Sequence, residues 1–182
     1  STIFQGIESF GNSSTVEINS TATTLPANAS YGHLIINLTT DPGADLSFNG
    51  VLTTINGSLT ISNTQSRDIQ LGTSTSSSLS ITNNLSISGT SAFVFTAGTG
   101  SPDITVNGNV TVSGGELDFC SSGATGSSTL YVKGNFSHTG GSVTSAGSGS
   151  SNGLLMNGNS MQTMESTGFA SPNQIAVTIA PT

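Results

Sequence analysis

Few side chains in this sequence are of the types that carry out acid–base, metal or nucleophilic chemistry. The 182 residues include nine carboxylates, two basic residues, two histidines and one cysteine. Glu116 and Asp118 are two residues apart, so on a strand they would share one face about 7 Å apart. A glycoside hydrolase uses two carboxyl groups at such a separation. The repeat predicts Ala92 and Ser142 as the neighbours of Glu116, and Val94 and Thr144 as those of Asp118. No other acid, histidine or lysine joins the pair, so we interpret it as a solvated strand face.

A polysaccharide lyase would need a basic residue beside acids that hold a cation. The basic residues are Arg67 and Lys133, which lie three repeats apart. We therefore predict that the chain is not an enzyme and has no catalytic residues.

The candidate metal ligands are also poorly grouped. Asp41-Pro-Gly-Ala-Asp45 could place two carboxylates around a cation, but calcium takes six or more oxygens, and a polar Pro-Gly turn is the plainer interpretation. His33 and His138 have no acidic or cysteine partner at zinc spacing. We predict no metal and no cofactor, and place His138 at the edge of the core below Val112.

Cys120 is alone, so the chain has no disulfide framework. It follows Phe119 in an alternating strand, which predicts a position on the outer face or at a turn. No Lys or Arg lies nearby in sequence to lower its pKa, which favours a small structural residue over a reactive thiol.

The elements that hold these residues are predicted by a repeat. A phrase of two alternating apolar segments around Asn, Gly, Ser or Lys recurs through the chain. Its anchor residues are 26, 25, 26 and 24 positions apart: Ile55, Ile81, Val106, Val132 and Met156. A third apolar segment follows at similar spacing: Ile69/Leu71, Phe93/Phe95, Leu117/Phe119 and Val143. Such a period is typical of a solenoid in which each unit buries its apolar face against its neighbours.

The sequence thus predicts an all-β, right-handed parallel β-helix of about seven coils of 18–26 residues, with three short strands per coil. We expect one domain over 1–182: shorter, less regular coils in 1–50, regular repeats in 51–170 and a terminal strand in 171–182. Ile18 and Ile36, taken as anchors ahead of Ile55, predict short first coils. The terminal strand has no evident cap, so we interpret the chain as a segment of a longer one.

An antiparallel sandwich is the alternative fold, since it also shows regular turns. It does not explain why the same turn sequence returns in register. In a stacked solenoid, the side chains at one turn position form a column and could hydrogen-bond to one another as an amide ladder. The residues at this position are Asn84, Asn109, Asn135 and Asn159.

Composition limits the partners. Ser and Thr together make up a third of the chain, and the net charge is −7. The shortage of Lys and Arg argues against nucleic acid and anionic membranes. No apolar stretch is long enough to cross a bilayer as a helix, so we predict no membrane insertion.

The phrases "ITVNGNVTVSGG", "LYVKGNFSHTGGSV" and "LLMNGNSMQTMESTG" resemble repeats of very large secreted proteins of Bacteroidota that carry a type IX secretion sorting domain. The resemblance spans roughly positions 50–170. It implies an extracellular or cell-surface location, a β-solenoid repeat region and a role in adhesion or in spacing other domains. This sequence contains no sorting domain, and the segment 1–50 fits the pattern only loosely.

From this we expect a non-enzymatic structural or adhesin repeat segment that acts as a rod or fibre. Its expected partners are flanking repeats of the same chain or end-to-end copies, with glycans or surfaces as further ligands. The alternatives are a glycan-binding adhesive surface, an ice-binding protein that uses outward Thr and Ser columns, and a polysaccharide-degrading β-helix enzyme. We expect the two hydroxyl columns to end in Leu155 and Met161.

Overall fold

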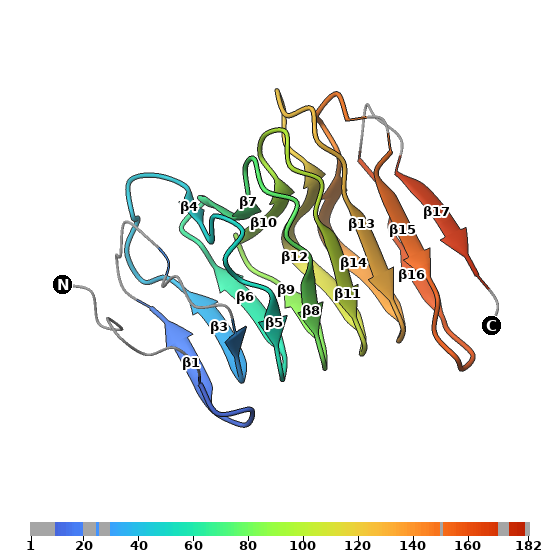
Figure 1. Cartoon of the computed structure of the whole chain (residues 1–182), viewed down its shortest axis with the longest axis horizontal. Helices are drawn as coiled ribbons and strands as arrows, with labels where there is room; N and C mark the ends of the chain where they lie inside the picture. Colours follow the sequence, from blue (N-terminus) through green and yellow to red (C-terminus); the bar gives the residue numbers. More distant parts are fainter. Residues whose placement is uncertain (1–9, 20–24, 26–29, 150, 171–174, 181–182) are drawn as a thin grey trace.

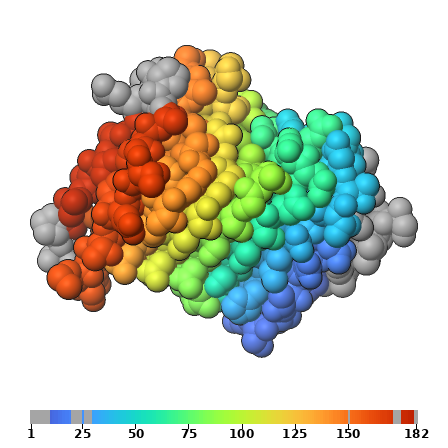
Figure 2. Space-filling model, turned by 180° about the vertical axis from the view of Figure 1, so that it is seen from behind, coloured from blue at the N-terminus to red at the C-terminus, as the bar shows by residue number. Residues whose placement is uncertain are grey.

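The computed structural model describes residues 10–19, 25, 30–149, 151–170 and 175–180. Over these residues the chain contains strands and no helix. All strand pairs are parallel, and the coils stack into a β-solenoid of about six turns (Figure 1). The predicted parallel β-helix is confirmed, with a coil count slightly below the expected seven. Figure 2 shows the coils as successive bands, with the N-terminal and C-terminal coils at opposite ends.

One face of the solenoid is a seven-stranded sheet in which each coil supplies one short strand. Its strands are β2 (Ser30–Tyr31), β5 (Thr54–Ile55), β8 (Leu79–Ile81), β11 (Asp103–Val106), β13 (Thr129–Val132), β15 (Gly153–Met156) and β17 (Ala176–Ile179). We call this face the seven-stranded sheet. Its alternating burial follows from the alternating apolar residues of the repeat.

The other two faces belong to one ten-stranded sheet. Its first limb contains β1 (Thr15–Ile18), β3 (His33–Asn37), β6 (Leu59–Asn63), β9 (Leu85–Ile87), β16 (Met164–Ser166) and the first halves of β12 (Val110–Cys120) and β14 (Phe136–Thr144). Its second limb contains β4 (Leu46–Ser47), β7 (Asp68–Gly72), β10 (Ala92–Thr96) and the second halves of β12 and β14.

The two limbs meet at a corner that β12 and β14 cross without a break. The register of their pairing shifts between Val112 and Glu116. Gly115 and Gly141 sit at this corner with φ of +67° and +76°, a backbone conformation that favours glycine. These glycines let the strand turn from one face of the rod to the next.

The predicted register of the regular repeats is confirmed. Ile55 pairs with Ile81, then Val106, Val132 and Met156 follow in the same column. In the second limb Phe93 pairs with Ile69 and with Leu117, which pairs with Val143. The inward residues of these columns are almost completely buried and form one continuous core.

Two predicted positions near the ends of the repeat region are wrong. Ile36 pairs with Ile61 and not with Ile55, so only the coil from Ile18 to Ile36 is short. Near the other end, Asn159 does not follow Asn135 in its column: Phe136 pairs with Met164, because residues 159–162 are an insertion in the turn. The first error arises because Leu-x-Ile phrases occur at two positions in a coil. The second arises because the insertion follows an Asn-Gly phrase that is itself in register.

Aromatic side chains of the second limb pack against one another in the core. The rings of Phe93 and Phe95 lie 5.3 Å apart, and those of Phe95 and Phe119 lie 5.1 Å apart, both edge to face. His138 is 1% exposed and lies beside Val112, as predicted. Its Nδ1 lies 3.1 Å from the Ser166 hydroxyl, so it is a buried, partnered side chain.

The two ends of the rod differ. At the N-terminal end the ring of Phe10 stacks on Tyr31 at 5.0 Å, and Val16 and Ile18 are only 7% exposed. At the C-terminal end Val177 and Ile179 are exposed. An aromatic side chain therefore packs against the first described strand of the seven-stranded sheet, whereas the last described strand exposes two apolar side chains.

Candidate functional site

The most regular polar feature of the rod is a column at the turn between the seven-stranded sheet and the first limb. From His33 to Asn135, one side chain per coil accepts the backbone N–H of the equivalent residue in the next coil, and Thr163 ends the column as a backbone donor. We call this column the turn ladder, and its residues are His33, Ser58, Asn84, Asn109, Asn135 and Thr163.

The ladder is strongest in its asparagine section. The Oδ1 atoms of Asn84, Asn109 and Asn135 each accept an N–H at 2.8 Å, from Asn109, Asn135 and Thr163 respectively. Toward the N-terminal end, His33 Nδ1 accepts the N–H of Ser58 at 3.1 Å, and Ser58 Oγ lies 3.4 Å from the backbone nitrogen of Asn84.

Backbone bonds return in the opposite direction beside each ladder bond. The carbonyl of Asn109 accepts the N–H of Leu85, and the carbonyl of Asn135 accepts the N–H of Val110, at 3.0 and 2.9 Å. Each coil is therefore tied to the next by two bonds at this position of the turn. Because these bonds satisfy polar backbone groups that would otherwise need water, they hold the turn in register.

The predicted amide ladder differs from this column in two ways. The bonds run from carboxamide to backbone and not between carboxamides. Asn159 does not occupy the column, because the inserted residues 159–162 place Thr163 next to Asn135. His33 and Ser58 were missed because the position requires only an acceptor atom, which several residue types supply. Thr163 was missed because it contributes only its backbone N–H.

The acidic pair Glu116 and Asp118 is not a solvated strand face. The predicted neighbours are correct: Ala92 and Ser142 flank Glu116, and Val94 and Thr144 flank Asp118. Asp118, however, is only 6% exposed, and Val94 beside it is 2% exposed. The Thr144 hydroxyl donates to Glu116 at 2.6 Å, and Asp118 accepts the N–H of Cys120 at 3.1 Å. The Asp118 carboxyl group is thus closed to a substrate.

Burial, together with the nearby charge of Glu116, raises the pKa of Asp118 to about 6, although the hydrogen bond from Cys120 opposes the shift. Asp68 lies in the same column as Glu116, one coil beyond Ala92. Burial and the charges of Asp45 and Glu116 raise the pKa of Asp68 as well. Sequence reasoning missed Asp68 because Ala92 separates it from Glu116.

Cys120 lies inside the molecule and not on the outer face. Its side chain is fully buried, and its Sγ lies 3.0 Å from the carbonyl oxygen of Gly126. The turn that follows β12 carries Gly126 over the sulfur, which explains the correction. Burial raises the pKa of the Cys120 thiol, so the neutral thiol is favoured.

Asp41 is held by an arginine at the surface. Arg67 Nε and Nη2 donate to its two oxygens at 2.8 and 3.0 Å, and the N–H of Gly43 donates to it at 2.8 Å. The Arg67 bond lowers the pKa of Asp41 to about 2. Asp45 instead accepts the N–H of Asp68 at 3.1 Å, so the two carboxylates serve different partners within a Pro-Gly turn.

Within the part of the chain that the structure describes, no three His, Cys, Asp or Glu side chains group as metal ligands. The same residues contain no helix that could cross a membrane.

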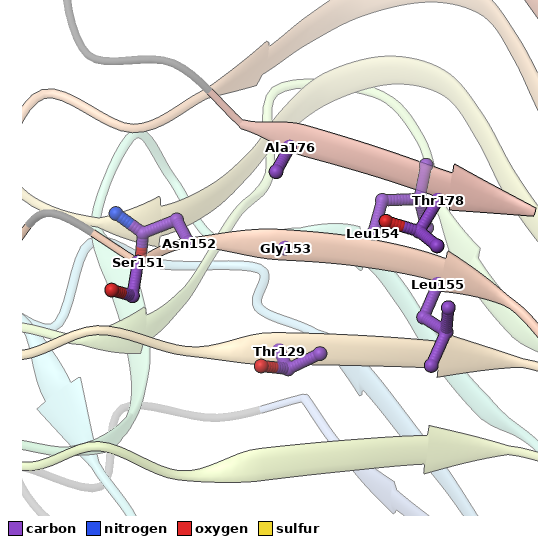
Figure 3. A pocket seen from close by; sticks show the side chains of 8 residues that line it. All are labelled: Thr129, Ser151, Asn152, Gly153, Leu154, Leu155, Ala176 and Thr178. Atoms are coloured by element: carbon purple, nitrogen blue, oxygen red, sulfur yellow. The ribbon is translucent and has the colours of Figure 1, made fainter.

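A shallow hollow lies on the outer surface of the seven-stranded sheet near its C-terminal end (Figure 3). Its volume is about 430 Å³, and Gly153 lies between Thr129 and Ala176 along its floor. Leu155 and Thr178 line the neighbouring column. The hollow exists because three successive outward residues of one column are small.

The predicted outward hydroxyl columns are present but interrupted. One runs from Thr54 through Ser80 and Thr105 to Tyr131 and Leu155. The other runs from Thr60 through Ser86, Thr111 and Ser137, and it continues to Glu165 and not to the expected Met161. Neither column is an array of identical hydroxyl groups.

Comparison of the chain with protein-family models, with curated proteins and with solved structures finds no match.

Proposed function

We propose that the chain is a non-enzymatic structural segment, a rod within a secreted or cell-surface protein of the adhesin type. The observation that carries the proposal is the turn ladder, in which one side-chain bond per coil repeats from His33 to Thr163. Such a column uses polar side chains to join coils along the axis, which suits a molecule whose task is to keep its length and direction.

The resemblance of the repeat phrases to secreted Bacteroidota proteins supports the same role and the extracellular location. The partners that we propose are flanking coils of the same protein or other copies, contacted through the ends of the rod. Terminal coils of a solenoid need such neighbours or caps to cover their apolar cross-section.

The location is tested by labelling cells that carry the gene with an antibody raised against residues 1–182. We expect label on intact cells or protein in the medium, with a cytoplasmic protein unlabelled in the same cells as the control. A signal that appears only after lysis would contradict the proposal.

A glycan-binding surface is the second candidate, and the hollow over Gly153 favours it. Hydroxyl groups of Thr129 and Thr178 lie beside the apolar Leu155 there, a mixture that suits the polar and apolar faces of a sugar ring. Gly153→Leu would fill the hollow from the outer surface. We expect binding on a glycan array to be lost in this variant while its melting temperature is retained; an array on which the native chain binds nothing would refute this candidate.

A further inference from the structure

The coil that contains Met156 divides its residues differently from the four coils before it. In those four coils, three residues form the turn between the buried anchor of the seven-stranded sheet and that of the first limb. The anchor pairs are Ile55 and Leu59, Ile81 and Leu85, Val106 and Val110, and Val132 and Phe136. Met156 pairs with Val132, and Met164 pairs with Phe136, so residues 157–163 fill the same turn. This turn is therefore four residues longer than its predecessors.

The next corner of the same coil is correspondingly short. The N–H of Ala170 donates to the carbonyl of Val143 at 3.0 Å, which aligns Phe169 with Val143. The chain thus takes three steps, from 166 to 169, between the first limb and the second. The four preceding coils take five to eight steps: Ile61 to Ile69, Ile87 to Phe93, Val112 to Leu117 and His138 to Val143. The short corner contains Gly168 at a φ of +123°, which favours glycine.

The side chain of Gln162 holds the long turn in place. In the preceding coils the N–H at the middle of the turn donates to the carbonyl of the equivalent residue, as Gly134 does to Gly108 at 3.0 Å. Between Gly134 and Gly158 the Gln162 carboxamide takes this position. Its Oε1 accepts the N–H of Gly158 at 2.8 Å, and its Nε2 donates to the carbonyls of Gly134 and of Val132, the latter at 2.9 Å. A single side chain thus bridges the turns of two coils.

The long turn also contains an unsatisfied polar atom. Among the described residues the buried Oδ1 of Asn157 has no hydrogen-bond partner. Such an atom destabilises the arrangement that contains it. Opposing this cost, Met164 packs against the core and Ser166 lies 3.1 Å from Nδ1 of His138. The observed arrangement is therefore a balance of competing contacts.

A shift of four residues would give this coil the spacing of the four before it. Asn159 would replace Thr163 beside Asn135, and residues 160–162 would form the strand. The turn would then contain three residues, and the corner would take seven steps, from 162 to 169, within the range of the other coils. Because the shift is an even number, inward and outward faces are preserved. Four residues move from the turn to the corner, so the neighbouring coils keep their places.

We propose that this coil is a two-register switch in which Gln162 latches the observed register. We call the observed arrangement the latched register and the shifted one the slipped register. The slip replaces the loop at residues 159–162 with a loop at the corner between the two limbs. A partner that binds one of these loops would shift the balance between the registers. The switch changes what the side of the rod displays, a property beyond the proposed rod function, which either register preserves.

Pairs of engineered cysteines report the register. Ser137 pairs with Glu165 in the latched register, so Ser137→Cys/Glu165→Cys places two thiols on adjacent strands about 4.8 Å apart, within reach of a disulfide. Ser137→Cys/Met161→Cys does so in the slipped register. Cys120 is fully buried and should not compete. In the otherwise native chain we expect the first pair to oxidise faster than the second.

Adding Gln162→Leu should reverse the order of the two oxidation rates. This substitution removes the three latch bonds and supplies an apolar side chain for the inward position beside His138. Ser160→Lys is the matched control, because Ser160 is exposed in the latched register and would point inward in the slipped one. The lysine alone should leave the first pair faster, and added to Gln162→Leu it should abolish the reversal.

Two results would overturn the proposal. One is a Gln162→Leu variant in which the first pair still oxidises faster. The other is a variant in which neither pair forms, because the coil would then have lost its register without adopting a second. Small-angle scattering of the same variants reports the length of the rod separately, so the proposed rod function is tested independently of the switch.

Discussion

The exposed asparagines of the turn ladder are structural residues, because their side-chain oxygens accept backbone N–H groups of the next coil. Asn109 lies on the surface, yet its Oδ1 holds the N–H of Asn135 while its own N–H is held by Asn84. At this position surface exposure is therefore a poor guide to tolerance of substitution.

Asn109→Ala should remove one inter-coil bond and leave the N–H of Asn135 to water. We expect the free energy of unfolding to fall by about 1 kcal/mol, which lowers the melting temperature by about 2–4 °C in a chain of this size. Thermal denaturation measures this. Thr111→Ser, two residues away in an outward hydroxyl column, is the control and should be silent; equal melting temperatures for both variants would mean that the ladder bond does not stabilise.

The buried Asp118 makes stability depend on pH. Its pKa is raised to about 6, so the protonated form is favoured in the folded state relative to the unfolded chain, where an Asp has its ordinary lower value. The resulting stability is fully present below the unfolded pKa and is lost as pH rises through about 6. We expect the native chain to be more resistant to urea at pH 5 than at pH 7.5, and Asp118→Asn to weaken that difference.

Asp41→Asn is the control for this pH experiment. Arg67 lowers the pKa of Asp41 to about 2, so its titration lies far below the window between pH 5 and 7.5. The variant should keep the native pH dependence there. If Asp118→Asn behaves like Asp41→Asn, the Asp118 carboxyl group does not titrate in this range.

At the scale of the element, the turns stack closely because glycine lies at their tightest points. A Cβ atom added to Gly134 would lie 2.5 Å from both Asn109 Oδ1 and the Gly108 carbonyl oxygen. The strand glycine Gly153 differs, because its nearest neighbour would be Thr129 Cγ2 at an ordinary 3.5 Å.

Gly134→Ala should therefore force two coils apart at the turn ladder, at a cost of about 1–3 kcal/mol. Gly153→Ala is the matched control and should change stability little. The free energy of unfolding in urea compares the two. A Gly134→Ala variant as stable as Gly153→Ala would show that the turn can relax around a methyl group.

The strands of the regular repeats could be predicted from sequence because each one carries an apolar anchor at a constant period. The first coils could not, since Ile36 lies in a Leu-x-Ile pattern that fits the column of Ile61 as well as that of Ile55. The burial of Asp118 and Cys120 also escaped prediction. It depends on turns that fold over the outer face, and alternation along one strand does not report such turns.

The candidate site was predictable to the same extent. Asn84, Asn109 and Asn135 stand in one column because their phrases align without gaps. His33 and Thr163 required knowledge of the register at the two irregular coils, and chemistry alone does not relate a histidine to an asparagine.

At the scale of the whole molecule, each coil contacts mainly its neighbours, so the rod should open one coil at a time. Pulled by its ends, it should lengthen in steps of about 80 Å, the extended length of a coil of about 25 residues. Optical tweezers measure these steps. Release of the whole chain in one event would show that the coils unfold as a single cooperative unit.

The hydrogen bonds at the Asn-Gly steps of this rod also affect how fast its asparagines deamidate. Five Asn-Gly steps occur in the chain, and in a flexible peptide the glycine nitrogen attacks the asparagine side chain to form a succinimide, with loss of ammonia. Here the N–H of each of these glycines is engaged: Gly50, Gly57, Gly108 and Gly153 donate to carbonyl oxygens of other residues, and Gly158 donates to Gln162 Oε1. To attack the side chain, each glycine nitrogen would first have to give up this hydrogen bond. The bonds that stack the coils thus slow the ageing of the asparagines, and mass spectrometry after long incubation should find deamidation in the unfolded chain well before the folded one.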